Sequence, residues 1–257
     1  MHRDTTKEFA GIAVDKIDYF KRNPIGFFIS TMMAGAYVGV GIMLILTLGN
    51  DADPASQNLI MGCFFGIALV LIIFAGADLF SGHIMYMTFG FLYKKIGMFA
   101  VIKDWIICWY GNLLGAVMLS FLFALGGGGG WIDDGSSLVH ILADAKINSS
   151  ITELLARAVI CNWLLCLAIW MTSKTRSDMA KCVLIFWCLF AFISAGFEHS
   201  IANMAIFTIS LLGDHPDTVT ISGLLYNLGW VSLGNVIGGA GFIGVAYYLT
   251  GHSITQR

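Results

Sequence analysis

Two polar segments interrupt an otherwise apolar sequence, and they contain its best candidates for chemistry. One holds Asp78, Ser81 and His83, and the other holds Glu198 and His199. An ionisable side chain at membrane depth is costly and is usually retained for function, so His199 is a candidate proton donor. The simpler alternative is a neutral histidine that only hydrogen-bonds a backbone group. Ser81 has two similar interpretations, since its hydroxyl group could bind a passing solute or its own loop.

The other three polar residues fit structural roles better than chemical ones. A carboxylate beside a helix break can accept hydrogen bonds from free N–H groups, which makes Asp78 and Glu198 candidate loop-stabilising residues. His83 could face a cytoplasmic vestibule or fix the same loop. A membrane-embedded metalloenzyme built on these three residues and His199 is an alternative class, but they lack the spacing of a metal site. We therefore expect no metal, no cofactor and no catalysis, and a metal assay on purified protein separates the two classes.

The composition places these segments in a protein that is surrounded by lipid. Apolar residues make up 58% of the 257 residues and charged residues only 12%, against about 25% charged in soluble domains. The mean hydropathy is +0.81, and a soluble fold of this length could not bury so much apolar surface. The net charge of −2 and the lack of a basic block argue against a nucleic-acid partner. All six cysteines lie in apolar stretches and are expected to be buried free thiols.

Long uncharged runs alternate with charged loops in a pattern that predicts six membrane crossings. The runs cover residues 24–50, 54–77, 105–132, 158–173, 182–197 and 218–256. Twelve of the fourteen Lys and Arg residues lie in the N-terminal segment, in alternate loops and at the C-terminus, whereas the intervening loops carry Asp. The positive-inside rule then places both termini in the cytoplasm.

Two of the crossings are too long to be plain helices. Residues 58–93 would form a helix of about 54 Å, against a hydrocarbon core of about 30 Å, and residues 182–212 are also too long. Each is therefore expected to be a broken helix, with the breaks at 78–83 and 194–200. Non-helical backbone at that depth is tolerated only where it is buried in protein or faces a water-filled cavity.

A short motif recurs in the third and sixth crossings. It reads Gly111-Asn112-x-x-Gly115 in the third and Gly234-Asn235-x-x-Gly238 in the sixth. Because each half would hold an odd number of crossings, the halves must have opposite orientations, as in the inverted repeats of transporters and channels. The motif alone is weak evidence, since Gly-x-x-x-Gly commonly just lets helices pack closely.

These observations divide the chain into three parts. Residues 1–23 carry apolar positions at helical spacing among nine charges, which is typical of an amphipathic helix on the membrane surface. Residues 24–250 form the six-span pore domain, and residues 251–257 form a short cytoplasmic tail.

Residues 196–204, Gly-Phe-Glu-His-Ser-Ile-Ala-Asn-Met, resemble the signature of the formate/nitrite transporter family. Residues 76–81, Gly-Ala-Asp-Leu-Phe-Ser, resemble the family's other break, with serine in place of threonine at Ser81. Residues 161–170 and the Gly82-His83 pair are most similar to its nitrite-channel branch. The resemblance implies an aquaporin-like, all-α membrane fold in a homopentamer with one pore in each protomer.

The resemblance also assigns roles to individual residues. It implies that His199 is the central pore histidine. It also implies that Lys146, which composition alone would make a solvated surface lysine, is a functional residue. Lys146, Arg157 and Asn162 are then the residues that attract anions, of which Lys146 and Arg157 lie at the outer mouth. The hydrophobic constrictions implied are Phe65, Leu69, Phe80 and Phe192.

The function implied is passage of small monovalent anions through the cell inner membrane, with nitrite favoured. A formate or hydrosulfide channel of the same family is the closest alternative, and the residues leave open whether the protein is a passive channel or a proton-coupled carrier. A channel for neutral solutes is a further alternative, but the sequence lacks the paired Asn-Pro-Ala boxes of aquaporins.

Overall fold

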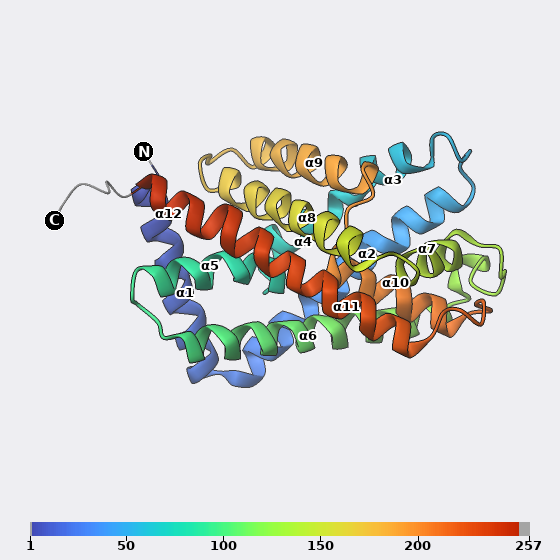
Figure 1. The fold of residues 1–257 in the computed structure, drawn as a ribbon, viewed down its shortest axis with the longest axis horizontal. Coiled ribbons are helices and arrows are strands. Elements are labelled where there is room, and N and C mark those ends of the chain that lie inside the picture. Colours follow the sequence, from blue (N-terminus) through green and yellow to red (C-terminus); the bar gives the residue numbers. More distant parts are fainter. Residues whose placement is uncertain (1, 252–257) are drawn as a thin grey trace.

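The protein is an all-helical bundle in the computed structural model, which describes residues 2–251 (Figure 1). The α-helices are α1 (Arg3–Arg22), α2 (Pro24–Asn50), α3 (Gln57–Phe65), α4 (Ile67–Ala75), α5 (Phe80–Leu92), α6 (Met98–Leu125), α7 (Leu138–Ile147), α8 (Ile151–Thr172), α9 (Asp178–Ser194), α10 (Ser200–Leu212), α11 (Ile221–Val236) and α12 (Ala246–Gly251). A π-helix, η2 (Ile237–Val245), joins α11 to α12, and a short 3-10 turn, η1 (Gly128–Gly130), follows α6. Most of the tail predicted at 251–257 lies outside the described residues.

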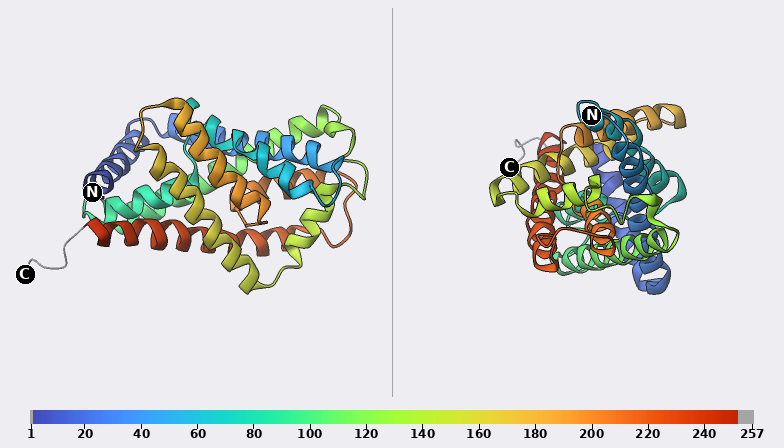
Figure 2. Two further views of the ribbon diagram at one scale, coloured as in Figure 1. Left: turned by 90° about the horizontal axis from the view of Figure 1, so that it is seen from above. Right: turned by 90° about the vertical axis from the view of Figure 1, so that its right-hand side faces the viewer.

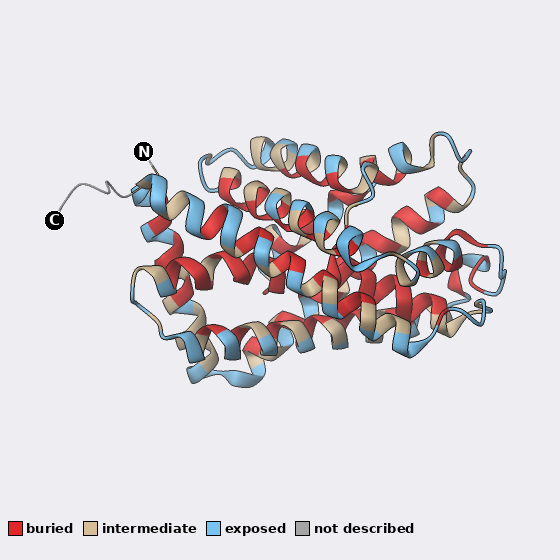
Figure 3. Ribbon diagram, in the orientation of Figure 1, coloured by how far each residue is buried: buried red, intermediate tan, exposed pale blue. Residues whose placement is uncertain are grey.

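Five helical stretches within residues 2–251 are long and apolar enough to cross a membrane. They are Pro24–Asn50, Gln57–Ala75, Met98–Leu125, Ile151–Thr172 and Ile221–Gly251. Large apolar side chains such as Ile106, Trp187 and Leu225 are exposed on the outside of the bundle, where Figure 3 shows the exposed residues of the helices. Lipid covers such a surface, and the protein is therefore a multi-pass membrane protein. The predicted fifth crossing is not among the five stretches, because α9 has 17 residues and ends at Ser194.

Two helical runs stop inside the bundle. α4 ends at Ala75 and α5 begins at Phe80, and α9 ends at Ser194 and α10 begins at Ser200. Gly76 and Gly196 follow these helix ends with φ angles of 77° and 68°, a conformation that glycine adopts without steric cost. We call residues 76–79 the first break and residues 195–199 the second break.

The first break is shorter than the sequence predicts. Ser81 and His83, which we expected within the break at 78–83, lie in the first turn of α5. The helix can begin as early as Phe80 because a side chain from α6 binds the free N–H group of that residue.

α5 and α10 occupy the middle of the bundle and extend from its centre towards opposite ends (Figures 1 and 2). Each has 13 residues, and most side chains in both are buried. α11, η2 and α12 form one continuous helix along the length of the bundle (Figure 1). Gly239 and Gly244 of η2 let this helix approach α5 closely, since added Cβ atoms would lie 2.8 Å from a methyl carbon of Ile84 and 2.5 Å from one of Thr88. The sequence analysis did not anticipate the π-helix.

α1 packs against the protein with its apolar face. Phe9, Ala10 and Ala13 are buried, and the ring of Phe9 lies 5.5 Å from that of Trp170 in α8 and 6.1 Å from that of Phe89 in α5. The face that the sequence predicts to rest on the membrane is thus covered by α5 and α8. α2 follows after Asn23, whose side chain accepts the N–H of Gly26 and caps the new helix.

Candidate functional site

The two breaks meet at a contact between His199 and Ser81. Nε2 of His199 lies 3.0 Å from Oγ of Ser81, and both side chains are buried. His199 directly precedes α10, and Ser81 is the second residue of α5. The N-terminal ends of both interior helices, which carry partial positive charge, therefore face one region of the protein. A small anion there would meet an imidazole, a hydroxyl group and two helix dipoles.

The second nitrogen of His199 indicates the resting state of its ring. The backbone N–H of Ala202 donates to Nδ1 over 3.3 Å, so Nδ1 carries no hydrogen. A neutral ring then has its hydrogen on Nε2, which donates to Ser81. The ring can take up a second proton only if the bond from Ala202 is broken, so this bond favours the neutral ring.

Asn162 lies beside this contact and is fully buried. Its Nδ2 donates to the carbonyl oxygen of Ser81 over 3.3 Å and to that of Asn235 over 2.7 Å. Sγ of Cys166 lies 3.4 Å from the same Ser81 carbonyl. Asn162 thus connects α5 to α11. The sequence analysis grouped Asn162 with the residues that attract anions and did not predict this connection.

Apolar side chains line one side of the contact. The rings of Phe192 and His199 lie 6.2 Å apart, and those of Phe65 and Phe192 lie 5.4 Å apart, edge to face. Leu69 and Phe80 are buried as well. The structure thus buries all four residues expected to form constrictions and arranges two of them in a row that ends at His199.

Asn112 of α6 binds three backbone groups around the first break. Its Oδ1 accepts the N–H of Phe80 over 2.9 Å. Its Nδ2 donates to the carbonyl oxygens of Asp78 over 3.0 Å and of Thr31 in α2 over 2.7 Å. The break is therefore fixed to both neighbouring helices.

Asn235 of α11 binds the equivalent groups around the second break. Its Oδ1 accepts the N–H of Ser200 over 3.0 Å, and its Nδ2 donates to the carbonyl oxygens of Glu198 over 3.0 Å and of Ala158 in α8 over 2.9 Å. These two asparagines, and not Asp78 or Glu198, satisfy the first N–H groups of α5 and α10. The glycines of the repeated motif allow the approach, since a Cβ atom on Gly238 would lie 2.3 Å from a backbone oxygen of α8.

Lys146 forms an ion pair inside the protein. Its Nζ lies 2.8 Å from Oε1 of Glu198, and the two side chains are 14% and 3% exposed. The other carboxylate oxygen accepts from Nδ2 of Asn203 over 2.6 Å, and Asn203 also donates to Asn227 over 2.8 Å. Because Glu198 balances its charge, Lys146 adds little net positive potential, and the pair attaches α7 to the second break.

Arg157 is the more exposed of the two outer cations. Its side chain is 42% exposed, and its guanidinium lies 3.6 Å from the carboxylate of Glu153, one turn earlier in α8. The backbone carbonyl of Arg157 accepts the N–H of Glu198 over 3.5 Å. The guanidinium remains at the surface, away from the contact between His199 and Ser81.

The first break has an ionic network of its own, which the sequence analysis did not connect. Lys16 of α1 pairs with Asp78, whose Oδ1 lies 3.0 Å from Nε2 of His83. Nδ1 of His83 lies 2.9 Å from Oδ2 of Asp104 in α6. Each ring nitrogen of His83 therefore faces a carboxylate oxygen, and a ring that carries both hydrogens can donate to both of them. The four residues of this network are Lys16, Asp78, His83 and Asp104. Taken in sequence order, they correspond to the four that are linked at the second break, which are Lys146, Glu198, Asn203 and Asn227.

A cavity of about 340 Å³ opens beside the first break. Its lining includes Lys16, Asp78, His83, Thr172 and Lys181. It lies on the side that carries the basic loops, where the sequence predicts the cytoplasm. His83 therefore both contacts Asp78 of the first break and lines this cavity.

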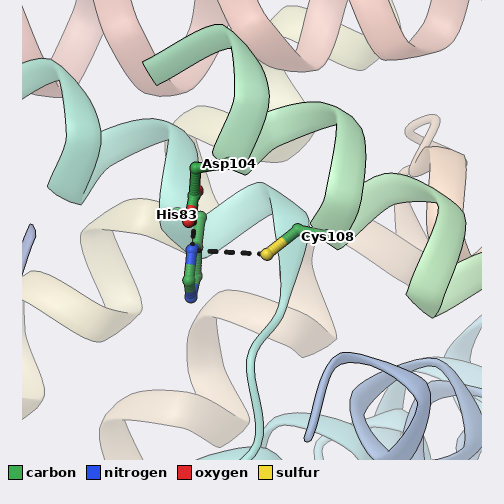
Figure 4. A group of neighbouring side chains, drawn as sticks. All are labelled: His83, Asp104 and Cys108. Atoms are coloured by element: carbon green, nitrogen blue, oxygen red, sulfur yellow. Dashed lines mark hydrogen bonds and ion pairs between the residues drawn. The ribbon is translucent and has the colours of Figure 1, made fainter. Parts of the chain in front are cut away.

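Three of the buried side chains near this cavity could hold a metal ion. Figure 4 shows His83, Asp104 and Cys108, whose ligand atoms all lie within 4.8 Å of one another. Sγ of Cys108 lies 3.4 Å from Nδ1 of His83. The sequence analysis missed Asp104 and Cys108, because they lie one helical turn apart and join His83 only through the packing of α6 on α5.

The comparisons with known proteins agree with this architecture. The profile described as formate/nitrite transporter matches residues 3–249. The nitrite transporter NirC of Escherichia coli (strain K12) is 45% identical over 251 residues, which cover 96% of this chain and 92% of that protein. A solved FNT family ion channel has a TM-score of 0.94 and 44% identity, covering 96% of this chain and 98% of that chain. A pentameric formate channel with formate bound has a TM-score of 0.75 and 25% identity, covering 90% of this chain and 98% of that chain.

A membrane bundle in which the N-terminal ends of two interior helices meet at a buried contact between a histidine and a serine has the architecture of a channel or transporter. The chain belongs to the formate/nitrite transporter family. The resemblance drawn from residues 196–204 is confirmed. Its relatives named above are transporters and channels.

Proposed function

We propose that the protein is an anion channel of the cell inner membrane and that nitrite is its main permeant. The proposal rests on the contact between His199 and Ser81, where two hydrogen-bond donors and two helix N-termini face one buried region. The 45% identity to the nitrite transporter NirC supports nitrite as the permeant.

The central region offsets the cost of removing an anion from water. A bare anion loses several kcal/mol or more on entering an apolar pore. The Nε2–H group of His199, the hydroxyl of Ser81 and the dipoles of α5 and α10 replace part of its hydration. Phe65, Leu69, Phe80 and Phe192 exclude water and larger solutes on the way.

His199 can also exchange a proton with the anion. An anion beside the ring stabilises the imidazolium that forms when the neutral ring gives up the hydrogen bond from Ala202 and Nδ1 takes a proton from water in the pore. The proton on Nε2 can then pass to the anion, which crosses the apolar segment as a neutral acid. This step would link flux to the proton gradient, whereas simple hydrogen bonding by the neutral ring supports passive conduction.

The charged residues act at the two mouths of the pore. Arg157 raises the local concentration of anions at the outer mouth because its guanidinium is exposed. Lys146 shares this role only weakly, since Glu198 neutralises it, and Asn162 positions Ser81. Asp78, Glu198 and His83 hold the breaks in place.

Six crossings in two inverted repeats complete the proposed architecture. The first half comprises α2, then α3 to α5, then α6, and the second half comprises α8, then α9 and α10, then α11 to α12. The matching contacts of Asn112 and Asn235 support this repeat, with the second and fifth crossings broken. Both termini are cytoplasmic, residues 1–23 cover the inner face, residues 24–250 form the pore, and residues 251–257 form the tail. The pentameric formate channel supports a homopentamer.

Formate is the second candidate permeant, since the solved relative with formate bound shares the fold. Purified protein in proteoliposomes separates the candidates through parallel measurements of nitrite, formate and hydrosulfide flux and of swelling in glycerol. We expect flux of anions, fastest for nitrite, and no glycerol swelling above that of empty liposomes. Glycerol swelling as fast as nitrite entry would show a neutral-solute channel and would refute the proposal.

A further inference from the structure

We propose that His83, Asp104 and Cys108 form a binding site for a divalent transition metal, with zinc the best fit. Nδ1 of His83 lies 2.9 Å from Oδ2 of Asp104 and 3.4 Å from Sγ of Cys108. All three residues are buried, and α5 and α6 direct their side chains to one place (Figure 4). One imidazole, one thiolate and one carboxylate are ligands that zinc accepts together, with a water molecule in the fourth position.

The second half of the protein shows that the fold does not need these residue types. Asn203 and Asn227 occupy the places of His83 and Asp104 and join each other through a hydrogen bond of 2.8 Å. Val231 stands four residues after Asn227, as Cys108 stands four residues after Asp104, and is equally buried. An amide pair and a valine suffice to pack α10 on α11. The imidazole, carboxylate and thiol beside the first break therefore add chemistry that packing does not require.

One atom of the group has no role in the hydrogen-bond network. Within residues 2–251, Oδ1 of Asp104 is buried and has no hydrogen-bond partner. Within the same range, Oδ1 of Asn203, at the place equivalent to His83, also has no partner, but an unpartnered oxygen costs more on a charged carboxylate than on a neutral amide. A metal ion bound by this carboxylate would supply the missing partner.

The surroundings of His83 resemble the outer shell of a metal site. A histidine that binds metal through one nitrogen commonly donates the other N–H to a carboxylate, which fixes the orientation of the ring. Here Nε2 of His83 faces Asp78 at 3.0 Å, which leaves Nδ1 for the metal. Lys16 pairs with Asp78 and balances its charge.

Charge is conserved when the metal binds. A metal-free His83 ring that carries both hydrogens would balance Asp104 beside a neutral Cys108 thiol. Binding of a divalent ion releases one proton from Nδ1 and one from Sγ, because metal ligands must be deprotonated. Two positive charges leave as two arrive, so the buried group remains neutral in both states.

The required movement is small. A tetrahedral zinc ion with bonds of about 2.0 Å to N and O and about 2.3 Å to S separates its ligand atoms by about 3.3–3.6 Å. Nδ1 and Sγ are already 3.4 Å apart, and Nδ1 and Oδ2 must separate slightly from 2.9 Å. The Asp104 oxygen and Sγ lie within 4.8 Å of each other and must approach to about 3.5 Å, which rotation of the two side chains can supply. The adjoining cavity, lined by Asp78 and His83, gives the ion a route from the aqueous side.

The test uses the intact purified protein in detergent, loaded with zinc and then with cobalt as a spectroscopic probe. After removal of free metal, we expect one zinc ion per protomer, and cobalt should produce an absorption band from thiolate-to-metal charge transfer. Cys108→Ser should abolish the band, and Asp104→Asn should weaken zinc binding by at least tenfold. Cys161→Ser removes a thiol of equal burial elsewhere and should leave both readouts unchanged.

The wild-type result decides the matter even if a variant fails to assemble. Substoichiometric zinc together with the absence of a thiolate band in the wild-type protein would overturn the proposal. Equal zinc binding by a well-assembled Cys108→Ser variant would overturn it as well. Neither readout depends on flux, so the result is independent of the proposed transport function.

Discussion

Asn112 and Asn235 hold the two breaks through equivalent hydrogen bonds, although 123 residues separate them in the sequence. Each accepts the first N–H of an interior helix and donates to two carbonyl oxygens. Lipid supplies no water to replace these bonds, so the breaks depend on the two side chains. The contact between His199 and Ser81 in turn depends on where the breaks place α5 and α10.

Replacement of either asparagine by alanine should destabilise the protein. Asn112→Ala and Asn235→Ala each leave one buried N–H group and two carbonyl oxygens without their partner, and each unsatisfied group costs about 1–3 kcal/mol. The measurement is the midpoint of thermal unfolding of the purified assembly. Asn148→Ala is the matched control, because Asn148 is exposed and bonds only to Asp144. Midpoints equal to that of the control would show that the asparagines do not hold the breaks.

Removal of Lys146 alone should be worse than removal of the whole ion pair. Lys146→Met leaves Glu198 buried and unpaired, and breaking a buried pair costs about 3–5 kcal/mol. The double variant Lys146→Met/Glu198→Gln removes both charges and should regain most of the lost thermal stability. If Lys146→Met unfolds at the same temperature as the wild type, the pair has no structural role.

Arg157 should contribute to flux by long-range attraction. Arg157→Gln should slow nitrite entry from outside most at low salt, since the Debye length falls from about 30 Å at 0.01 M to about 3 Å at 1 M salt. Arg176→Gln alters an exposed cation in a loop expected to be cytoplasmic and should leave entry unchanged. An Arg157 effect of equal size at both salt concentrations would indicate a local structural role instead.

Part of this architecture follows from the sequence for simple physical reasons. A run from 58 to 93 cannot cross a bilayer once as a straight helix, so a break is predictable from length, and the polar residues from Asp78 to His83 indicate its place. The repeated Gly-Asn-x-x-Gly motif likewise indicates equivalent places in two helices. Only the structure shows which groups these two asparagines bind, because the bonds join residues that are far apart in the sequence.

Other features could not be predicted because they depend on long-range pairing. Lys146 looks like a solvated lysine, and Glu198, its partner, lies 52 residues away. The start of α5 at Phe80 requires an acceptor 32 residues later in α6. The pairing of Lys16 with Asp78 was also missed, although both are charged residues beside the first break, because the packing of α1 on α5 was not anticipated.

The proposed topology can be tested by chemical labelling. Single cysteines in place of Asp51, Asp133 and Asp217 should react with an impermeant maleimide in intact cells, in a background that lacks the partly buried Cys63 and Cys182. A cysteine in place of Lys94 is the control and should react only after the cells are opened. Protection of any of the three outer positions in intact cells would contradict six crossings with cytoplasmic termini.

The role of His199 is tested by two variants that each keep a different part of the imidazole. Asn at position 199 can still accept the N–H of Ala202 but cannot reach Ser81, whereas Gln can still offer an N–H near Ser81 but cannot cap α10. Neither side chain titrates. The assembly of both variants must first be verified by size, because loss of a buried hydrogen bond costs about 1–3 kcal/mol.

Nitrite flux into proteoliposomes, measured against pH with and without a proton gradient, then tests the account most directly. Wild-type flux should rise as the pH falls, because a lower pH favours the protonation of His199 that the bond from Ala202 opposes, and both His199→Asn and His199→Gln should lose that dependence. His199→Gln should retain more flux than His199→Asn, because it keeps a donor at the contact with Ser81. If both variants assemble normally and keep the rate and the pH profile of the wild type, His199 is a structural residue and the account of the pore is wrong.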